Sequence, residues 1–152
     1  MINLEEAEKF DNLKTKVLKY ILYKKRTEQE IRQKFQNEDE NMLEDVIEYL
    51  KEANYIDDKK YIDKAINEYM NLKSMSIKEI SYKLYQKGIS KNIVDDYICE
   101  NKEKMLEYEI SSAKKIFIKK SVSAEESEIR EFLYKKGYMK ETVDIALIEE
   151  GK

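Results

Sequence analysis

The chain has 152 residues, and 40% of them are charged. Its 29 Lys and Arg nearly balance its 32 Asp and Glu, so the formal net charge of −3 gives no bulk signature of a nucleic-acid-binding protein. Histidine is absent, which removes the commonest general base and most zinc ligand sets. With three isolated glycines, no glycine-rich phosphate loop is present either. We therefore expect neither an enzyme nor a cofactor.

Composition also indicates the fold class and the compartment. Proline is absent, so helix interiors meet almost no breaker and the chain is predicted to be all-α. The single cysteine, Cys99, cannot form an internal disulfide, and it ends an apolar helical stretch where we expect it to fill the core. No apolar run approaches the roughly 20 residues that span a bilayer, and the N-terminus lacks the pattern of a signal peptide. We expect a cytoplasmic protein with no membrane contact.

In chain order, the first predicted unit consists of three helices. A long helix over residues 5–24 has apolar positions that recur every three or four residues, namely Ala7, Phe10, Leu13, Val17 and Ile21. A short helix follows Thr27 and buries Ile31 and Phe35. A third helix, near residues 40–53, has a wide apolar stripe that comprises Met42, Leu43, Val46, Ile47 and Leu50.

The second and third predicted units follow the same plan. Asp57 and Asp58 are predicted to form a turn and a helix N-terminus, because acids there complement the helix dipole. The long helix that follows has the stripe Tyr61, Ile62, Ala65, Ile66, Tyr69 and Met70, and the two shorter helices contain Ile77, Ile80, Leu84, Ile93, Val94, Tyr97 and Ile98. In the third unit the corresponding positions are Leu106, Ile110, Ala113, Phe117, Ile129, Phe132, Leu133, Val143, Ala146 and Leu147.

A repeat of 49 residues relates these units. The step separates Ile31, Ile80 and Ile129, and it also separates Phe35, Leu84 and Leu133. Capping boxes are predicted to start the short helices at Thr27, Ser76 and Ser123, with Glu30, Glu79 and Glu126 as their acidic partners. Gly88 and Gly137 suit the left-handed residue that ends a helix. We predict three tandem three-helix repeats, at residues 1–55, 56–100 and 101–152, in an elongated, curved helical-repeat protein.

The copies differ in three places. Met42 corresponds to Ile93 at an offset of 51, so the first unit has lost two residues after Phe35, and its turn has no glycine. Ser123 lies six residues before Ile129, whereas the other two predicted cap residues lie four before their isoleucines. The third short helix is therefore predicted to have a lengthened start.

Charges are distributed unevenly. Residues 9–26 carry seven basic residues against one acid, a local net of +6, and residues 38–58 carry nine acids against one lysine, a local net of −8. Basic stretches recur at the second and third units. Such charges are typical of solvated helix faces, and the alternative is that basic patches face phosphate.

The stretch from Leu50 to Ile98 carries several motif elements in order. It contains Tyr55-Ile56-Asp57-Asp58 followed by Tyr61, then a closing Lys87-Gly88-Ile89, and the third unit repeats the Lys136-Gly137 pair. In this the chain resembles the RecX family of recombination regulators. The resemblance implies a non-enzymatic protein of DNA repair, homologous recombination and the SOS response that binds RecA filaments on DNA and usually restrains their recombinase and ATPase activity. We also expect a monomer, with weak direct DNA contact through basic patches.

The surface that would contact RecA and DNA is predicted on the short helices of the second and third units. Its basic members are Lys83, Lys87, Arg130, Lys135 and Lys136, and its tyrosines are Tyr82, Tyr85 and Tyr134. Interface tyrosines carry contact area at low entropic cost. Packing between units is an equal alternative for these tyrosines.

Two other functional classes remain open. A sequence-reading DNA-binding protein could place one short helix in a major groove, since cap, helix, turn and helix occur in that order. However, no short helix concentrates Arg, Asn and Gln, and the chain has only three Arg. A general helical-repeat scaffold for protein interaction is the second alternative.

Overall fold

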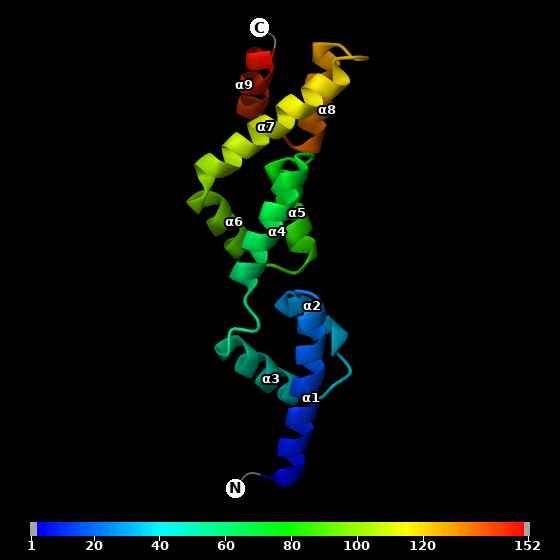
Figure 1. The fold of residues 1–152 in the computed structure, drawn as a ribbon, viewed down its shortest axis with the longest axis vertical. Coiled ribbons are helices and arrows are strands. Elements are labelled where there is room, and N and C mark those ends of the chain that lie inside the picture. Colours follow the sequence, from blue (N-terminus) through cyan, green and yellow to red (C-terminus); the bar gives the residue numbers. More distant parts are fainter. Residues whose placement is uncertain (1–2, 151–152) are drawn as a thin grey trace. The chain divides into compact units, whose positions relative to one another are not determined.

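A computed structural model describes residues 3–150, and side chains as far as Ile148. Within these residues the chain is entirely helical, as predicted (Figure 1). The nine helices are α1 (Leu4–Tyr23), α2 (Glu28–Lys34), α3 (Glu40–Glu52), α4 (Asp58–Leu72), α5 (Ile77–Gln86), α6 (Lys91–Glu100), α7 (Lys102–Lys120), α8 (Glu126–Lys136) and α9 (Lys140–Glu150). Each predicted repeat contains three of them. The predicted repeat boundaries fall between α3 and α4 and between α6 and α7, and they remain a prediction.

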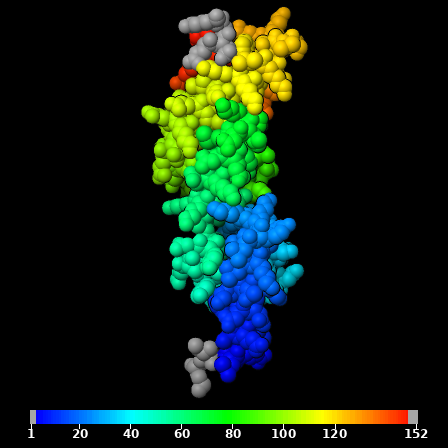
Figure 2. All heavy atoms as spheres, viewed as in Figure 1, coloured from blue at the N-terminus to red at the C-terminus, as the bar shows by residue number. Residues whose placement is uncertain are grey.

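The chain folds into two compact units. Unit 1 comprises the residues up to Ile62 together with Lys87–Ile89, and unit 2 comprises Asp63–Gln86 and the residues from Ser90 onward. None of the helices, over the described residues, is long and apolar enough to cross a membrane. The space-filling view shows the side chains that surround these helices (Figure 2).

Each unit has its own apolar core. In unit 1 the buried cluster consists of Leu13, Val17, Ile31, Leu43, Val46, Ile47, Leu50 and Ile56. In unit 2 the cluster under α7, α8 and α9 consists of Ala113, Ile129, Leu133, Tyr138, Val143, Ala146 and Leu147. The isoleucines of the 49-residue repeat are fully buried, because each lies on the inward face of a short helix. The repeat is therefore a repeat of core positions.

Two of the three predicted capping boxes are confirmed. Thr27 accepts the N–H of Glu30 at 3.1 Å, and the Glu30 carboxylate accepts the N–H of Thr27. Ser76 and Glu79 form the same reciprocal pair, at 3.1 and 3.0 Å. A box of this kind satisfies two backbone donors that the first helical turn leaves unpaired.

The third box, at Ser123, is wrong. Its N–H and that of Ala124 both bond to the carbonyl of Lys120, so these residues complete a turn after α7 instead of opening the next helix. The residue that precedes α8 is Glu125, and its side chain makes no capping bond. Glu125 lies 49 residues after Ser76, so the period is kept and the predicted lengthened start is absent.

Glycine ends the short helix in the second and third repeats. Gly88 has φ +91° and Gly137 has φ +98°, in the left-handed region. A Cβ atom on Gly88 would lie 2.3 Å from the Cβ of Gln29, and one on Gly137 would lie 3.0 Å from the Cβ of Lys78. Glycine is thus required by backbone conformation and by a close neighbour. In the first repeat α2 ends earlier, with Phe35 as its last flanking residue, and needs no glycine.

The two aspartates of the family motif have different roles. Asp57 accepts the N–H groups of Lys59 and Lys60 at 3.0 and 3.2 Å, which confirms that it caps α4. Asp58 accepts the N–H of Glu28, the first residue of α2, at 3.1 Å. Burial raises the pKa of the Asp58 carboxyl.

The expectation for Cys99 is wrong. The side chain is exposed near the end of α6, because Val94 is the buried residue of that helix and Cys99, five positions later, lies on a different face.

Candidate functional site

A junction between consecutive repeats occurs twice, and it explains the Lys-Gly pairs. The hydroxyl of Thr27 donates to the carbonyl of Lys87 at 2.6 Å, and the hydroxyl of Ser76 donates to the carbonyl of Lys136 at 2.8 Å. Each cap residue therefore accepts a bond from its own helix and donates one to the turn of the next repeat. Two of the predicted contact residues, Lys87 and Lys136, thus stand beside a structural joint.

The acidic residues of the capping boxes extend this junction. Glu30 lies 4.0 Å from the ammonium of Lys87, and Glu79 lies 3.2 Å from that of Lys136. The junction is consequently built from the cap hydroxyl, the box glutamate and the Lys-Gly turn. Lys87 and Glu30 both belong to unit 1.

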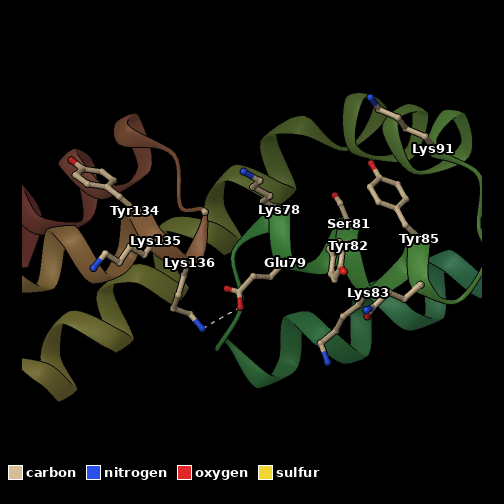
Figure 3. Close-up of a pocket in the computed structure, with 12 residues that line it drawn as sticks. Lys78, Glu79, Ser81, Tyr82, Lys83, Tyr85, Lys91, Tyr134, Lys135 and Lys136 are labelled. Carbon is tan, nitrogen blue, oxygen red and sulfur yellow. Dashed lines mark hydrogen bonds and ion pairs between the residues drawn. The ribbon is translucent and has the colours of Figure 1, made fainter.

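A groove in unit 2 gathers most of the predicted contact residues. It has a volume of about 640 Å³ and is lined by α5, the start of α6 and the end of α8 (Figure 3). We call it the lysine groove; its lining residues are Lys78, Glu79, Ser81, Tyr82, Lys83, Tyr85, Gln86, Lys91, Tyr134, Lys135, Lys136 and Gly137. Six of the eight residues predicted for the contact surface are among them.

The lysine groove is strongly basic. Five lysines line it against the single acid Glu79, which gives a formal charge of +4. Lys78 and Lys91 have no carboxylate within 4.0 Å over the described part of the chain, and the ammonium of Lys83 lies 5.9 Å from the centre of the Tyr69 ring. Lys135 pairs with Glu131 at 3.3 Å, but both side chains are exposed, so that pair holds the lysine weakly. Most of this charge is available to a partner.

Two of the three groove tyrosines are exposed. Tyr82 is 62% exposed and Tyr134 is 40% exposed, so neither serves chiefly as packing between helices. The hydroxyl of Tyr85 lies 3.3 Å from Asp95 of α6, and burial together with this carboxylate raises the pKa of Tyr85. Tyr85 thus supports the groove wall, while Tyr82 and Tyr134 present contact area.

Arg130 is not part of the groove. Its guanidinium donates to Asp144 of α9 at 2.7 Å and lies 3.4 Å from Glu126. The hydrogen bond that Arg130 donates to Asp144 is the main reason that the pKa of Arg130 is raised. Because its charge is already compensated, Arg130 fastens α8 to α9 and is a poor candidate for binding an external anion.

The sequence prediction missed two lysines that line the groove. Lys78 belongs to a basic stretch of the second predicted repeat, but no motif distinguishes it from the surface lysines near it. Lys91 is the first residue of α6, and it reaches the groove only because the α5–α6 turn folds back. The periodicity of separate helices cannot place it in the same groove as the residues of α5.

The remaining motif residues are structural. Ile56 and Ile89 are buried at 5% and 3% exposure, Tyr61 is partly buried, and Tyr55 is half exposed in the turn before α4. No group of three His, Cys, Asp or Glu side chains that could hold a metal ion occurs in the described part of the chain. The chemistry of the groove is that of lysine, tyrosine and a single carboxylate.

Comparison with known proteins links this arrangement to one family. The chain is 31% identical over 157 residues to the "Regulatory protein RecX" of Staphylococcus haemolyticus, an alignment that covers 97% of this chain and 58% of that protein. It is 32% identical over 143 residues to the protein of the same name from Clostridium beijerinckii, with 89% and 66% covered. The chain thus spans about three fifths of the length of the staphylococcal relatives that it matches. No family model matches the chain.

Solved structures agree with the sequence relatives. The crystal structure of RecX from Lactobacillus salivarius superimposes with a TM-score of 0.80 at 25% identity, over 94% of this chain and 97% of that one. A second structure, of a regulatory protein RecX, has a TM-score of 0.79 at 23% identity, over 92% of this chain and 73% of that one, and it supports the fold alone.

Proposed function

The chain belongs to the RecX family of regulatory proteins, and from this premise we propose that it binds RecA filaments assembled on DNA and restrains their recombinase and ATPase activity. It performs no chemistry of its own, and it acts as a monomeric binding protein in the cytoplasm. The lysine groove of unit 2 is the contact surface. The observation that carries this proposal is the coincidence of five lysines and two exposed tyrosines in one groove.

The groove chemistry suits such a partner. A RecA filament is a helical polymer of an acidic ATPase on a polyanion, so its surface offers carboxylates and phosphates. Lysines that lack a partner attract such groups and accelerate encounter at low salt. Exposed tyrosines add contact area at low entropic cost. A repeated filament also allows several modest contacts to act together.

The proposal assigns different roles to the residues predicted from sequence. Lys83, Lys135, Tyr82 and Tyr134 contact the filament. Lys136 contributes charge, although it is also held by Glu79. Tyr85 supports the groove wall, and Lys87 and Arg130 act as structural residues, through Glu30 and Asp144 respectively. Lys78 and Lys91 join the contact surface.

Neutralising the groove lysines tests the proposal. In the quadruple variant Lys78→Gln, Lys83→Gln, Lys91→Gln, Lys135→Gln, the capping boxes and the junction lysines are untouched. At about 0.5 kcal/mol for each exposed pair, the loss sums to roughly 2 kcal/mol, or about thirtyfold in Kd for filaments. Fluorescence anisotropy with labelled protein and preassembled filaments measures it.

The matched control removes the same charge elsewhere on unit 2. Lys64, Lys102, Lys104 and Lys140 are exposed and do not line the groove. Their fourfold change to Gln should alter Kd by less than about threefold, since only long-range attraction is lost. Equal losses in the two variants would show that bulk charge, and not the groove, governs binding.

An activity assay tests regulation separately from binding. DNA-dependent ATP hydrolysis by RecA should fall when the wild-type chain is added and should fall much less with the groove variant. Hydrolysis that is unchanged by saturating wild-type protein would refute the regulatory proposal, even if binding were observed.

A further inference from the structure

One side of α3 carries acidic residues that the fold does not use. Asp45, Glu48 and Glu52 follow one another at steps of three and four residues, so they lie on the same side of the helix. All three are exposed, whereas the opposite side of α3 supplies buried core residues. We call these three residues the acidic face of α3.

Most of the charge on the acidic face is uncompensated. Over the described part of the chain, no ammonium or guanidinium group lies within 4.0 Å of Asp45 or Glu52, and Glu48 lies 3.8 Å from Lys51. Lys51 also forms a closer ion pair with Glu28, so its charge is shared between two carboxylates. The acidic face therefore keeps most of its three negative charges.

Helix stability does not account for the acidic face. Glu48 and Glu52 are four residues apart, a spacing at which like charges repel one another on a helix surface. Glu52 is also the last residue of α3, where the helix dipole disfavours a negative charge. Because these charges oppose helix formation, an interaction with another molecule explains them better than folding does.

The lysine groove of unit 2 has the complementary charge. Its five lysines and one glutamate give +4, and Lys78 and Lys91 have no carboxylate partner within the described residues (Figure 3). Tyr82 and Tyr134 line the same groove and are exposed, and Tyr49, which is 48% exposed, follows Glu48 on α3. The two surfaces thus offer opposite charges and aromatic contact area.

We propose that the lysine groove of one copy of the chain accepts the acidic face of α3 from a second copy. The second copy is the occupant that charge complementarity favours, because residues 38–58, which contain this face, carry a local net charge of −8. The contact joins two different surfaces, so it is head-to-tail and forms open chains of copies unless their rotation closes a ring. Exposed ion pairs contribute little each, so single copies prevail when the protein is dilute.

Self-association hides the groove, a consequence that rests on the function proposed above. A copy docked in the groove covers the lysines that we assign to filament contact, so self-association and filament binding exclude each other. The monomer is then the form that binds filaments, and association of free copies limits how much of it is available.

Sedimentation velocity of the full chain, without RecA or DNA, tests the contact. At low salt the weight-average sedimentation coefficient of the wild type should rise between about 10 µM and about 500 µM protein, a range in which a weak contact becomes populated. The rise should disappear at high salt, because exposed charges are screened. A wild-type coefficient that stays at the monomer value over this range would overturn the proposal.

Neutralising the acidic face should weaken self-association. We expect a loss of about tenfold in Asp45→Asn, Glu48→Gln, Glu52→Gln, from three lost ion pairs. Its fold should be at least as stable as that of the wild type, since repulsion within α3 is removed. The matched control Asp96→Asn, Glu100→Gln, Glu103→Gln removes the same side chains from exposed positions of unit 2 and should change self-association less than twofold. Equal losses in the two variants would overturn the proposal in favour of bulk charge.

Mixing two variants tests which surfaces meet. The groove variant Lys78→Gln, Lys83→Gln, Lys91→Gln, Lys135→Gln keeps its acidic face, and the acidic-face variant keeps its groove. Each should remain largely monomeric alone, whereas an equimolar mixture should form dimers and no longer chains, because only one complementary pair of surfaces is left. A mixture without dimers, or one with longer chains, would overturn the head-to-tail assignment.

Filament binding separates this proposal from the function on which its consequence rests. At a concentration at which the wild type self-associates, the acidic-face variant should occupy severalfold more filament sites, because its groove is uncovered. Equal occupancy by the two proteins would overturn the masking of the groove. Wild-type filament affinity in the groove variant would refute the filament function instead, and the sedimentation results would still decide whether copies associate.

Discussion

Glu109 is a buried carboxylate whose removal should be the most damaging single polar change in unit 2. It lies on α7 with no solvent exposure. Its two oxygens accept the N–H of Ile77, the first residue of α5, at 2.8 Å and the N–H of Met139, just before α9, at 3.0 Å. One side chain therefore joins the starts of two helices, where the helix dipoles favour a negative charge.

The size of the effect follows from these two bonds. The two N–H groups bond different oxygens of Glu109, so in Glu109→Gln the amide oxygen replaces only one of these acceptors, while the side-chain NH₂ group faces the other donor. One hydrogen bond to a charged group, worth about 1.5–3 kcal/mol, is lost and a buried N–H is left unpaired. We expect the free energy of unfolding to fall by about 2–3 kcal/mol. Glu109→Ala should cost more, about 4 kcal/mol, because both bonds disappear and a cavity remains.

Urea denaturation followed by far-ultraviolet circular dichroism measures the loss, with Glu107→Gln as the control. Glu107 is exposed on the same helix, so its change should stay within about 0.5 kcal/mol. Amide hydrogen exchange gives a second readout, because the N–H groups of Ile77 and Met139 should exchange faster in Glu109→Gln alone. Equal stability of the two variants, with both amides still protected, would refute the reasoning.

Three other changes have defined outcomes. Thr142→Val should raise the free energy of unfolding by about 1 kcal/mol in urea denaturation, because the buried hydroxyl has no partner in the described residues, whereas a loss would show that the hydroxyl is satisfied. Ser76→Ala should cost about 2 kcal/mol, since the cap and the bond to Lys136 are lost together, and Ser76→Thr, which keeps the hydroxyl, should cost far less. Burial first, and then Asp63, raises the pKa of Tyr97 to about 12 from 10.0. The folded state therefore holds this proton more tightly than the unfolded state does, so the stabilising contribution of Tyr97 is complete below pH 10 and is lost as the pH rises towards 12. In a pH series of denaturation curves, Tyr97→Phe should flatten that decline in stability. An unchanged decline would contradict the pKa shift.

The helical repeat is predictable because its signals are local. A capping box depends on two residues three positions apart, as at Thr27 and Glu30, and the 49-residue step of the buried isoleucines shows directly in the sequence because one three-helix unit is repeated. The capping box at Ser123 was wrongly predicted because only the local spacing was considered. The residues Ser123 and Glu126 have the right spacing for a box, but α7 ends with a turn whose bonds to Lys120 already occupy the backbone of Ser123.

The site was only partly predictable. Tyr82, Lys83, Tyr134 and Lys135 could be proposed from sequence because they lie on equivalent short helices next to a Lys-Gly turn. Lys91 could not be proposed from sequence, because it belongs to a different helix, and the periodicity of a sequence does not show where a turn directs the next helix.

Which charged side chains form ion pairs could not be predicted from the sequence either. Arg130 resembles a free surface cation when the chain is read alone, yet Asp144, 14 residues away, pairs with it at 2.7 Å. Arg26 follows two lysines in a strongly basic stretch, but the sequence does not show that its guanidinium lies over the ring of Tyr20.

Fold class, repeat length, most helix ends and the family resemblance could thus be read from the residues, because hydrophobic period, caps and left-handed glycines act over a few positions. Which cations are neutralised, which tyrosines are exposed and which carboxylates are buried depended on packing between helices far apart in sequence. The two roles of Ser76 illustrate the division. Its bond to Glu79 lies within three residues and is written in the motif, whereas its bond to Lys136 spans 60 residues and exists only once consecutive repeats are packed.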